Sequence, residues 1–200
     1  MKLQIGEQQI DYKKKPSVED VIGRINEELT DGYYFSHFVA DGMEVYDEHE
    51  EFLESRLGQI KVLEVVIKNE KQFMNDVLLS AEEYVRRAMP EIEVLVEEFQ
   101  AGPTADTWGN FELLLGGASW LIDMLELMEK SNERPSNWQQ FEQQATSMQL
   151  EVKNLHAAVD QNNHKQIAEV IQQGLLPVCK ELEVLIGQAI DVDGERENLH

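Results

Sequence analysis

The pattern of apolar and polar positions changes once along the chain and divides it into two parts. Up to residue 68, short apolar segments alternate with period two or line a single helical stripe. From residue 69, apolar residues recur every three or four positions and no segment alternates like a strand. The sequence therefore predicts a mixed α/β part over 1–68, a helical part over 69–190 and a polar tail over 191–200.

The first part begins with a predicted hairpin, in which apolar residues 3–5 and 10–12 alternate around a turn at Gly6. Ser17, with Asp20 three residues later, has the spacing of a helix N-cap, and the helix is expected to stop at Asp31-Gly32. The elements predicted after this helix are a strand over 33–40, a turn at 41–42, a short strand over 43–46, an irregular acidic stretch and a last strand over 60–67.

The order of these elements resembles the ubiquitin-like β-grasp. Residues 38–45, FVADGMEV, look like that fold's third strand, tight turn and short fourth strand. The family's modifier and sulfur-carrier members end in a free Gly-Gly after the last strand. Here the last strand runs directly into a helix, so the resemblance implies a docking surface rather than activation and conjugation. A junction without a linker also predicts one rigid two-part body.

The second part predicts four amphipathic helices with short connections. The first runs from 70 to about 100, and Pro90 predicts a kink or break near 86–89. Gly102-Pro103 ends it, and Thr104 or Asp106 caps the next helix. Ser136 with Gln139 predicts the start of the third helix, and Asn163 with Gln166 the start of the fourth, where Gly174 and Pro177 predict another kink.

Four helices with short connections favour an antiparallel up-down bundle. The heptad rhythm of the third helix allows a homodimeric coiled coil as the alternative. Monomer and homodimer therefore both remain open.

Composition restricts the partners. The chain has 17 Lys and Arg against 39 Asp and Glu, a net charge of −22 that both parts share. Such a chain repels phosphate backbones and anionic lipid heads, which argues against nucleic-acid and membrane partners and for a basic protein partner. With one cysteine, Cys179, and no apolar leader at its start, the sequence is typical of a cytoplasmic protein.

No catalytic constellation or cofactor motif is recognisable. His156, Asp160 and His164 have a metal-ligand spacing, but a predicted turn at 160–163 separates them. A di-iron bundle site needs Glu-x-x-His on two helices, and none of the four predicted helices carries that motif. His49 lies in an acidic loop that is expected to be solvated, and Cys179, although beside Lys180, is expected to be a core residue. We therefore expect no catalytic residue, metal or cofactor.

Two features are candidate binding sites. Glu91, Glu93, Glu97 and Glu98 form an acidic stretch on the first long helix, which is either a solvated face or a surface for a basic partner. Gly116 and Gly117 lie inside a helical pattern, which costs about 1 kcal/mol each relative to alanine. They predict close packing of a neighbouring helix, with the ring of Trp120 or Trp138 as the simplest contact, or a ligand pocket. The methionines fall mostly on apolar faces, and an exposed Met-rich groove for a partner helix is the alternative to a core role.

These patterns together favour a non-enzymatic interaction protein, a scaffold or adaptor. A narrower alternative is an acidic cytoplasmic chaperone for an exported client, because small acidic helical proteins resemble secretion chaperones in composition. The alternative from another class is a small-molecule-binding protein with a pocket between the two parts or at Gly116-Gly117.

Overall fold

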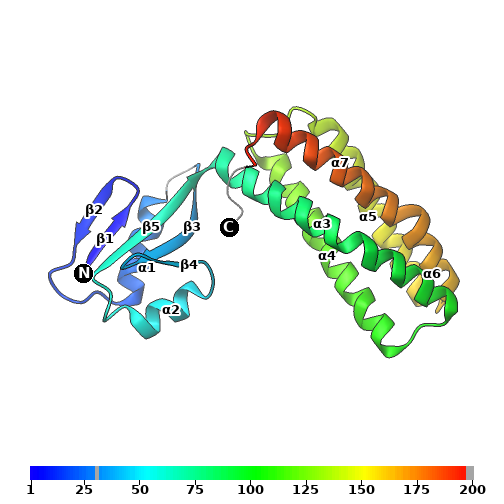
Figure 1. Ribbon diagram of the computed structural model, residues 1–200, viewed down its shortest axis with the longest axis horizontal. Helices are drawn as coiled ribbons and strands as arrows, with labels where there is room; N and C mark the ends of the chain where they lie inside the picture. The colour runs from blue at the N-terminus through cyan, green and yellow to red at the C-terminus, as the bar shows by residue number, and fades with distance from the viewer. Residues whose placement is uncertain (30–31, 197–200) are drawn as a thin grey trace. The chain divides into compact units, whose positions relative to one another are not determined.

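The computed structural model describes residues 1–29 and 32–196, and the chain divides into two compact units, Met1–Phe73 and Met74–His200. The first unit holds a five-stranded mixed sheet and two helices, and the second is helical (Figure 1). The predicted α+β class is confirmed.

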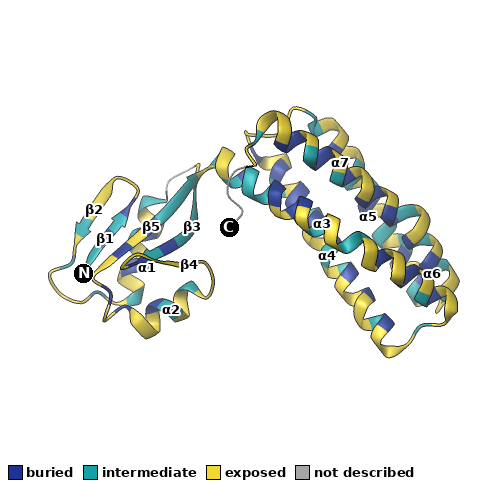
Figure 2. Ribbon diagram, in the orientation of Figure 1, coloured by how far each residue is buried: buried dark blue, intermediate teal, exposed yellow. Residues whose placement is uncertain are grey.

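The strands of the first unit form one sheet of order β2-β1-β5-β3-β4. β1 runs antiparallel to β2 and parallel to β5, and β3 pairs antiparallel with both β5 and β4. Val21 and Ile25 of α1 and Leu53 of α2 join the inward residues of the strands in one buried core (Figure 2). The elements are β1 (Lys2–Ile5), β2 (Gln8–Asp11), α1 (Val18–Glu28), β3 (Tyr33–Ala40), β4 (Met43–Val45), α2 (His49–Arg56) and β5 (Val62–Asn69).

Short-range sequence features place several of these boundaries as predicted. The Ser17 hydroxyl accepts the backbone N–H of Asp20 while the Asp20 carboxylate accepts that of Ser17, the reciprocal pair of a capping box. Asp41 has a φ of 50° in the turn after β3, and its carboxylate accepts the backbone N–H groups of Lys61 and Val62. These bonds lower the pKa of Asp41 and tie the turn to the start of β5. The stop predicted at Asp31 lies outside the described residues.

The acidic stretch before β5 is a helix, α2, and not the irregular segment that was predicted. Leu53 and Leu57, four residues apart, are both buried in the core of the first unit. Within residues 49–57, six of the nine residues are charged or polar, so the pattern is too short to show helical periodicity. Burial of one leucine pair thus decides the local structure.

β5 passes into α3 (Glu70–Ala101) without a linker, as the sequence indicates. The Asn69 side chain accepts the N–H of Gln72 at 2.9 Å, and the Gln72 side chain accepts the N–H of Asn69 at 3.1 Å. The ring of Phe73 stacks on Tyr34 of β3, with centroids 4.2 Å apart. The first turn of α3 therefore belongs to the first unit, and the boundary lies five residues beyond the predicted one.

The second unit consists of helices that bury their apolar stripes against one another (Figure 2). α5 contacts α4 on one side and the α6–α7 run on the other. Thr104 caps α4 through a capping box with Thr107, and Asn163 caps α6, both as predicted. After α3 the elements are α4 (Ala105–Lys130), α5 (Trp138–Asp160), α6 (His164–Val170), η1 (Ile171–Leu175) and α7 (Leu176–Asp193).

The break predicted at Pro90 is absent, because α3 runs through it as one helix. Pro90 is exposed, and so is Arg86, whose carbonyl loses its usual donor four residues on. Water can bind that carbonyl on the exposed side, where helix carbonyls already tilt outward. The irregularity predicted around Gly174 and Pro177 is a π-helical segment, η1, within a continuous helical run.

Two predictions that involve the end of α7 were wrong. The first is the cap, because Ser136 does not cap α5. Its N–H and hydroxyl both donate to the Asp193 carboxylate, at 2.9 and 3.0 Å. α7 extends to Asp193, so the first residues of the predicted tail are helical.

Candidate functional site

A groove about 400 Å³ in volume lies between α3 and α4. Both walls are amphipathic helices, and the residues that line the groove recur at the three- and four-residue spacing of one helical face. We call it the α3–α4 groove. Its lining residues are Tyr84, Ala88, Glu91, Ile92, Val94, Leu95, Asn110, Leu113, Leu114 and Gly117.

The groove leaves large apolar side chains in contact with water. Leu113 is 74% exposed and Val94 50% exposed, on opposite walls. Trp120, one turn beyond Gly117, is 40% exposed, and its ring contacts Tyr84 edge-on at a centroid distance of 5.5 Å. Single exposed apolar residues are common on protein surfaces, but here several of them lie around one depression.

At Gly117 a side chain of α3 packs directly against α4. A Cβ built on Gly117 would lie 1.4 Å from the Tyr84 hydroxyl oxygen, so only glycine leaves room for this ring. The close neighbour of Gly117 is the side chain of Tyr84 on the neighbouring helix, and not the ring of a tryptophan. Burial raises the pKa of Tyr84, with a smaller contribution from Cys179.

Gly116 has no such role. A Cβ there meets nothing within 4 Å, and the residue is exposed. The prediction of close packing at Gly116 is wrong, because one step along a helix turns a residue by about 100° away from the facing wall.

The four glutamates of α3 do not share one face. Glu91 lines the α3–α4 groove, and Glu98 follows it by two helical turns on the same side. Glu93 faces α7, where its carboxylate accepts a hydrogen bond from the Lys180 ammonium at 3.1 Å. Glu97 lies one turn beyond Glu93 on the same side of α3. The groove therefore brings together Glu91 and Gly117 from the predicted candidates and leaves Glu93, Glu97 and Gly116 elsewhere.

The methionines do not form an exposed groove. None lines the α3–α4 groove, and the methionines at positions 74, 124, 128 and 148 are buried in the helical core. A core role accounts for them.

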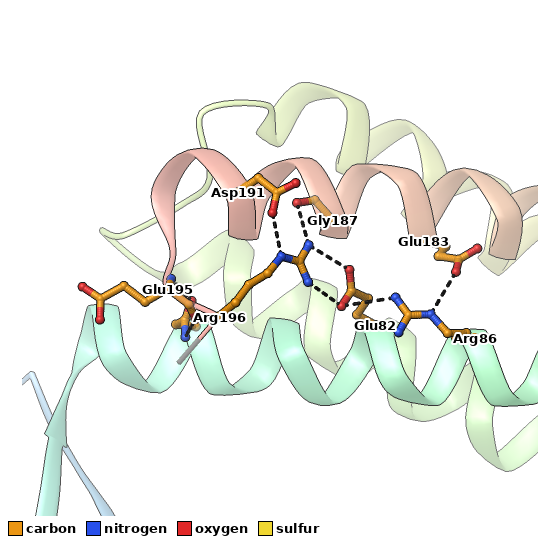
Figure 3. Close-up of polar contacts among 8 residues, drawn as sticks. Glu82, Arg86, Glu183, Gly187, Asp191, Glu195 and Arg196 are labelled. Carbon is orange, nitrogen blue, oxygen red and sulfur yellow. Dashed lines mark hydrogen bonds and ion pairs between the residues drawn. The ribbon is translucent and has the colours of Figure 1, made fainter. Parts of the chain in front are cut away.

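A polar cluster joins α3 to the end of α7 and was not predicted (Figure 3). Arg196 donates two hydrogen bonds to the nearly buried carboxylate of Glu82, at 2.9 and 3.1 Å, and a third to Asp191 at 2.6 Å. These carboxylates, Glu82 first, raise the pKa of Arg196, so its charge is permanent. The Asn75 side chain also exchanges two hydrogen bonds with the backbone of Glu195. The cluster fixes the end of the described chain to α3.

The histidines predicted as possible ligands do not converge. His156 is exposed on α5, whereas the ring of His164, on α6, lies near Phe99 and Trp108. His49 bonds the Val45 carbonyl and contacts two phenylalanine rings. Within residues 1–29 and 32–196, no three His, Cys, Asp or Glu side chains are grouped to hold a metal ion. No helix in these ranges is both long and apolar enough to cross a bilayer.

Cys179 is buried, and burial raises the pKa of its thiol to about 11. Lys180 is paired with Glu93 and does not activate it. At pH 8 only about one thiol in a thousand is then ionised. We expect the native protein to react slowly with a thiol reagent such as DTNB at pH 8, and rapidly once guanidinium unfolds it. Fast stoichiometric labelling of the native protein would contradict this burial.

The comparisons with known proteins concern the second unit. A family model described as Domain of unknown function (DUF8042) matches residues 76–184, more than half of the chain. The chain belongs to the DUF8042 family. No curated protein and no solved structure matches it. Both walls of the α3–α4 groove lie inside the DUF8042 region, whereas Arg196 and the sheet lie outside it.

Proposed function

We propose that this chain is a non-enzymatic interaction protein that binds a protein partner through the α3–α4 groove. The observation that supports this most directly is the exposure of Leu113 and Val94 on the walls of one open depression, with the exposed Trp120 beside its Tyr84 end. Releasing water from such a surface favours association, and grooves between two helices are a recurrent docking surface for apolar segments of partners. Under the chaperone alternative, the exported client would bind to this same groove.

Two finer structural proposals accompany this one. We propose that the first unit is a ubiquitin-like β-grasp, on the basis of the strand order β2-β1-β5-β3-β4 with parallel β1 and β5 at its centre. We also propose that α3, α4, α5 and the α6–α7 run form an antiparallel four-helix bundle, which the short connections between them support. A β-grasp unit whose last strand continues into a helix has no free tail for conjugation, which fits a docking module.

A small apolar ligand is a second candidate for the groove. The volume of about 400 Å³ lies within the usual range of ligand pockets, and the lining is mainly apolar. At a hundredfold excess over its Kd, a ligand would stabilise the folded protein by about 2.7 kcal/mol. This stabilisation would raise the melting temperature. A thermal-shift screen of apolar metabolites separates this candidate from a protein partner.

The proposed function is tested by capture from native lysate with tagged full-length protein and two matched variants. Val94→Asp places a charge in the groove, whereas Val184→Asp changes an equally exposed valine on α7, 51% against 50% exposed. Quantitative mass spectrometry should show a partner that Val94→Asp loses by about tenfold or more and that Val184→Asp retains. Loss with both variants, or with neither, would remove the groove as the binding site.

A further inference from the structure

The described residues offer several cavities and clusters, and the α3–α4 groove is the one whose shape and charge together specify an occupant. We propose that it binds an amphipathic α-helix of a partner protein, with lysine or arginine near the end of that helix that lies beside the α3–α4 loop. This inference rests on the proposed function and names the kind of partner.

The dimensions of the groove suit a short helix. The lining residues of α3 extend from Tyr84 to Leu95, eleven steps at 1.5 Å each, or about 17 Å. This length corresponds to about three helical turns, enough for apolar residues at positions i, i+3, i+4 and i+7 of a partner.

The walls favour a helix over an extended segment. The lining residues of α3 and α4 use their backbone N–H and C=O groups within their own helices, so they offer no strand edge to pair with. An extended peptide on this apolar floor would lose water from its backbone groups without gaining partners. A helix satisfies those groups internally and presents only side chains.

The charge of the groove is concentrated from its middle toward one end. Glu91 and Glu98 lie seven residues apart on the groove side of α3. On α4, Asp106 precedes Asn110, Leu113 and Gly117 by four, seven and eleven residues, which places it on the same face. Glu91 lies near the middle of the α3 lining, and Glu98 and Asp106 lie beyond the lining toward the α3–α4 loop, whereas Tyr84 and Trp120 are at the opposite end.

Two of these carboxylates, those of Glu91 and Asp106, are exposed to a cation from outside. None of the three has an ion-pair partner within residues 1–29 and 32–196. Glu98 is half-buried, and one of its oxygens is buried without a hydrogen-bond donor. Arg87, the basic residue nearest Glu91 on this flank, is paired with Glu83 at 3.5 Å. Lysine or arginine at one end of a bound helix therefore gains attraction that an acidic or neutral helix does not.

The same charge argues against a second copy of this chain as the occupant. At a net charge of −22, two copies repel each other, and the loop end of the groove would meet another acidic surface. A basic amphipathic helix is the occupant that both the apolar floor and the carboxylates favour.

The probe is a displayed library of 18-residue helices on an alanine-rich scaffold, with all outward positions randomised. It is selected on the full-length wild-type protein at low salt. Enriched sequences should combine an apolar stripe with lysine or arginine within two turns of one end. By fluorescence anisotropy, an enriched peptide should bind about tenfold or more weakly to Val94→Asp and within about twofold to Val184→Asp. Glu91→Gln with Glu98→Gln should weaken it by about fivefold and reduce its salt dependence.

Each alternative result overturns the inference in a recognisable way. Enrichment of helices without basic ends removes the charge rule. Undiminished binding of an enriched peptide in which a central proline prevents helix formation removes the helix. Self-association of the wild type that Val94→Asp abolishes assigns the groove to a second copy. If no helix is enriched while Val94→Asp still loses a partner from lysate, the inference fails and the proposed function stands. If no helix is enriched and Val94→Asp also retains every captured partner, both the inference and the proposed function fail.

Discussion

Arg196→Ala is expected to lower the free energy of unfolding of the second unit by about 1–3 kcal/mol, although it removes a side chain at the end of the described chain. Glu82 is the reason. Its side chain is only 10% exposed, and Arg196 holds both of its carboxylate oxygens. Without Arg196 the remaining cation is Arg86, at 3.5 Å, so a nearly buried carboxylate keeps a single weak partner. Arg196 also helps to hold residues 194–196 against α3. Its removal therefore weakens the two hydrogen bonds between Asn75 and the backbone of Glu195, which adds to the loss of stability.

The control for this prediction is Arg87→Ala. Arg87 is 74% exposed and pairs with the exposed Glu83 at 3.5 Å, so its loss should change stability by about 0.5 kcal/mol or less. Tryptophan fluorescence in urea reports the second unit alone, because positions 108, 120 and 138 hold all three tryptophans. Equal losses in the two variants would mean that burial of Glu82 has no special cost.

A double variant separates the buried charge from the lost contacts. In Glu82→Gln the side chain is neutral and costs less to leave without a cation. Adding Arg196→Ala to that background should therefore cost clearly less than in the wild type. Arg196→Lys should recover only part of the stability, because an ammonium cannot donate two parallel hydrogen bonds to one carboxylate.

This cluster illustrates what the sequence does not reveal. Glu82 lies four residues after Leu78 and three before Val85, both buried, so it falls on the apolar stripe of α3. A carboxylate in that position indicates a need for a partner, and this signal was present in the sequence. The identity of the partner was not, because Arg196 is 114 residues away and only the meeting of α3 with the end of α7 brings them together.

Local features were predictable for the opposite reason. The caps at Ser17, Thr104 and Asn163, and the strand that ends before Asp41-Gly42, depend on residues within three or four positions of one another. Pro90 shows the limit of such rules. Whether a proline breaks a helix depends on whether its lost hydrogen bond faces water or the core, and this is a property of the packed unit.

The candidate site was predictable in part. Two glycines inside a helix indicated a close contact, and one of them, Gly117, makes it. The groove itself depends on which faces of α3 and α4 meet. Glutamates that are close in the sequence, such as Glu91 and Glu93, lie on different sides once the helix forms. Val94 and Leu113 have no large apolar residue three or four positions away, so each lies off the apolar stripe of its helix. Only the packing of α3 against α4 places these two exposed side chains on the walls of one groove.

The second large effect is that alanine at two neighbouring glycines should change the stability of the second unit in opposite directions. Gly116→Ala should stabilise the second unit by about 0.5–1 kcal/mol, since alanine favours the helix and its methyl group meets open space. Gly117→Ala brings the same gain in helix propensity but places a methyl group against the Tyr84 ring. Either the ring turns out or α3 and α4 separate, and such overpacking costs about 1–3 kcal/mol. We therefore expect Gly117→Ala to unfold at lower urea than the wild type and Gly116→Ala at higher urea.

Tyr84→Ala tests the cause of this difference. Once the ring is absent, Gly117→Ala has no obstacle and should become stabilising, as Gly116→Ala is in the wild type. The displaced ring should also reach the groove, so Gly117→Ala is expected to weaken partner capture while Gly116→Ala leaves it unchanged. If both alanines stabilise the wild type equally, Tyr84 moves aside without cost. The glycine at 117 would then be explained neither by packing nor by the shape of the groove.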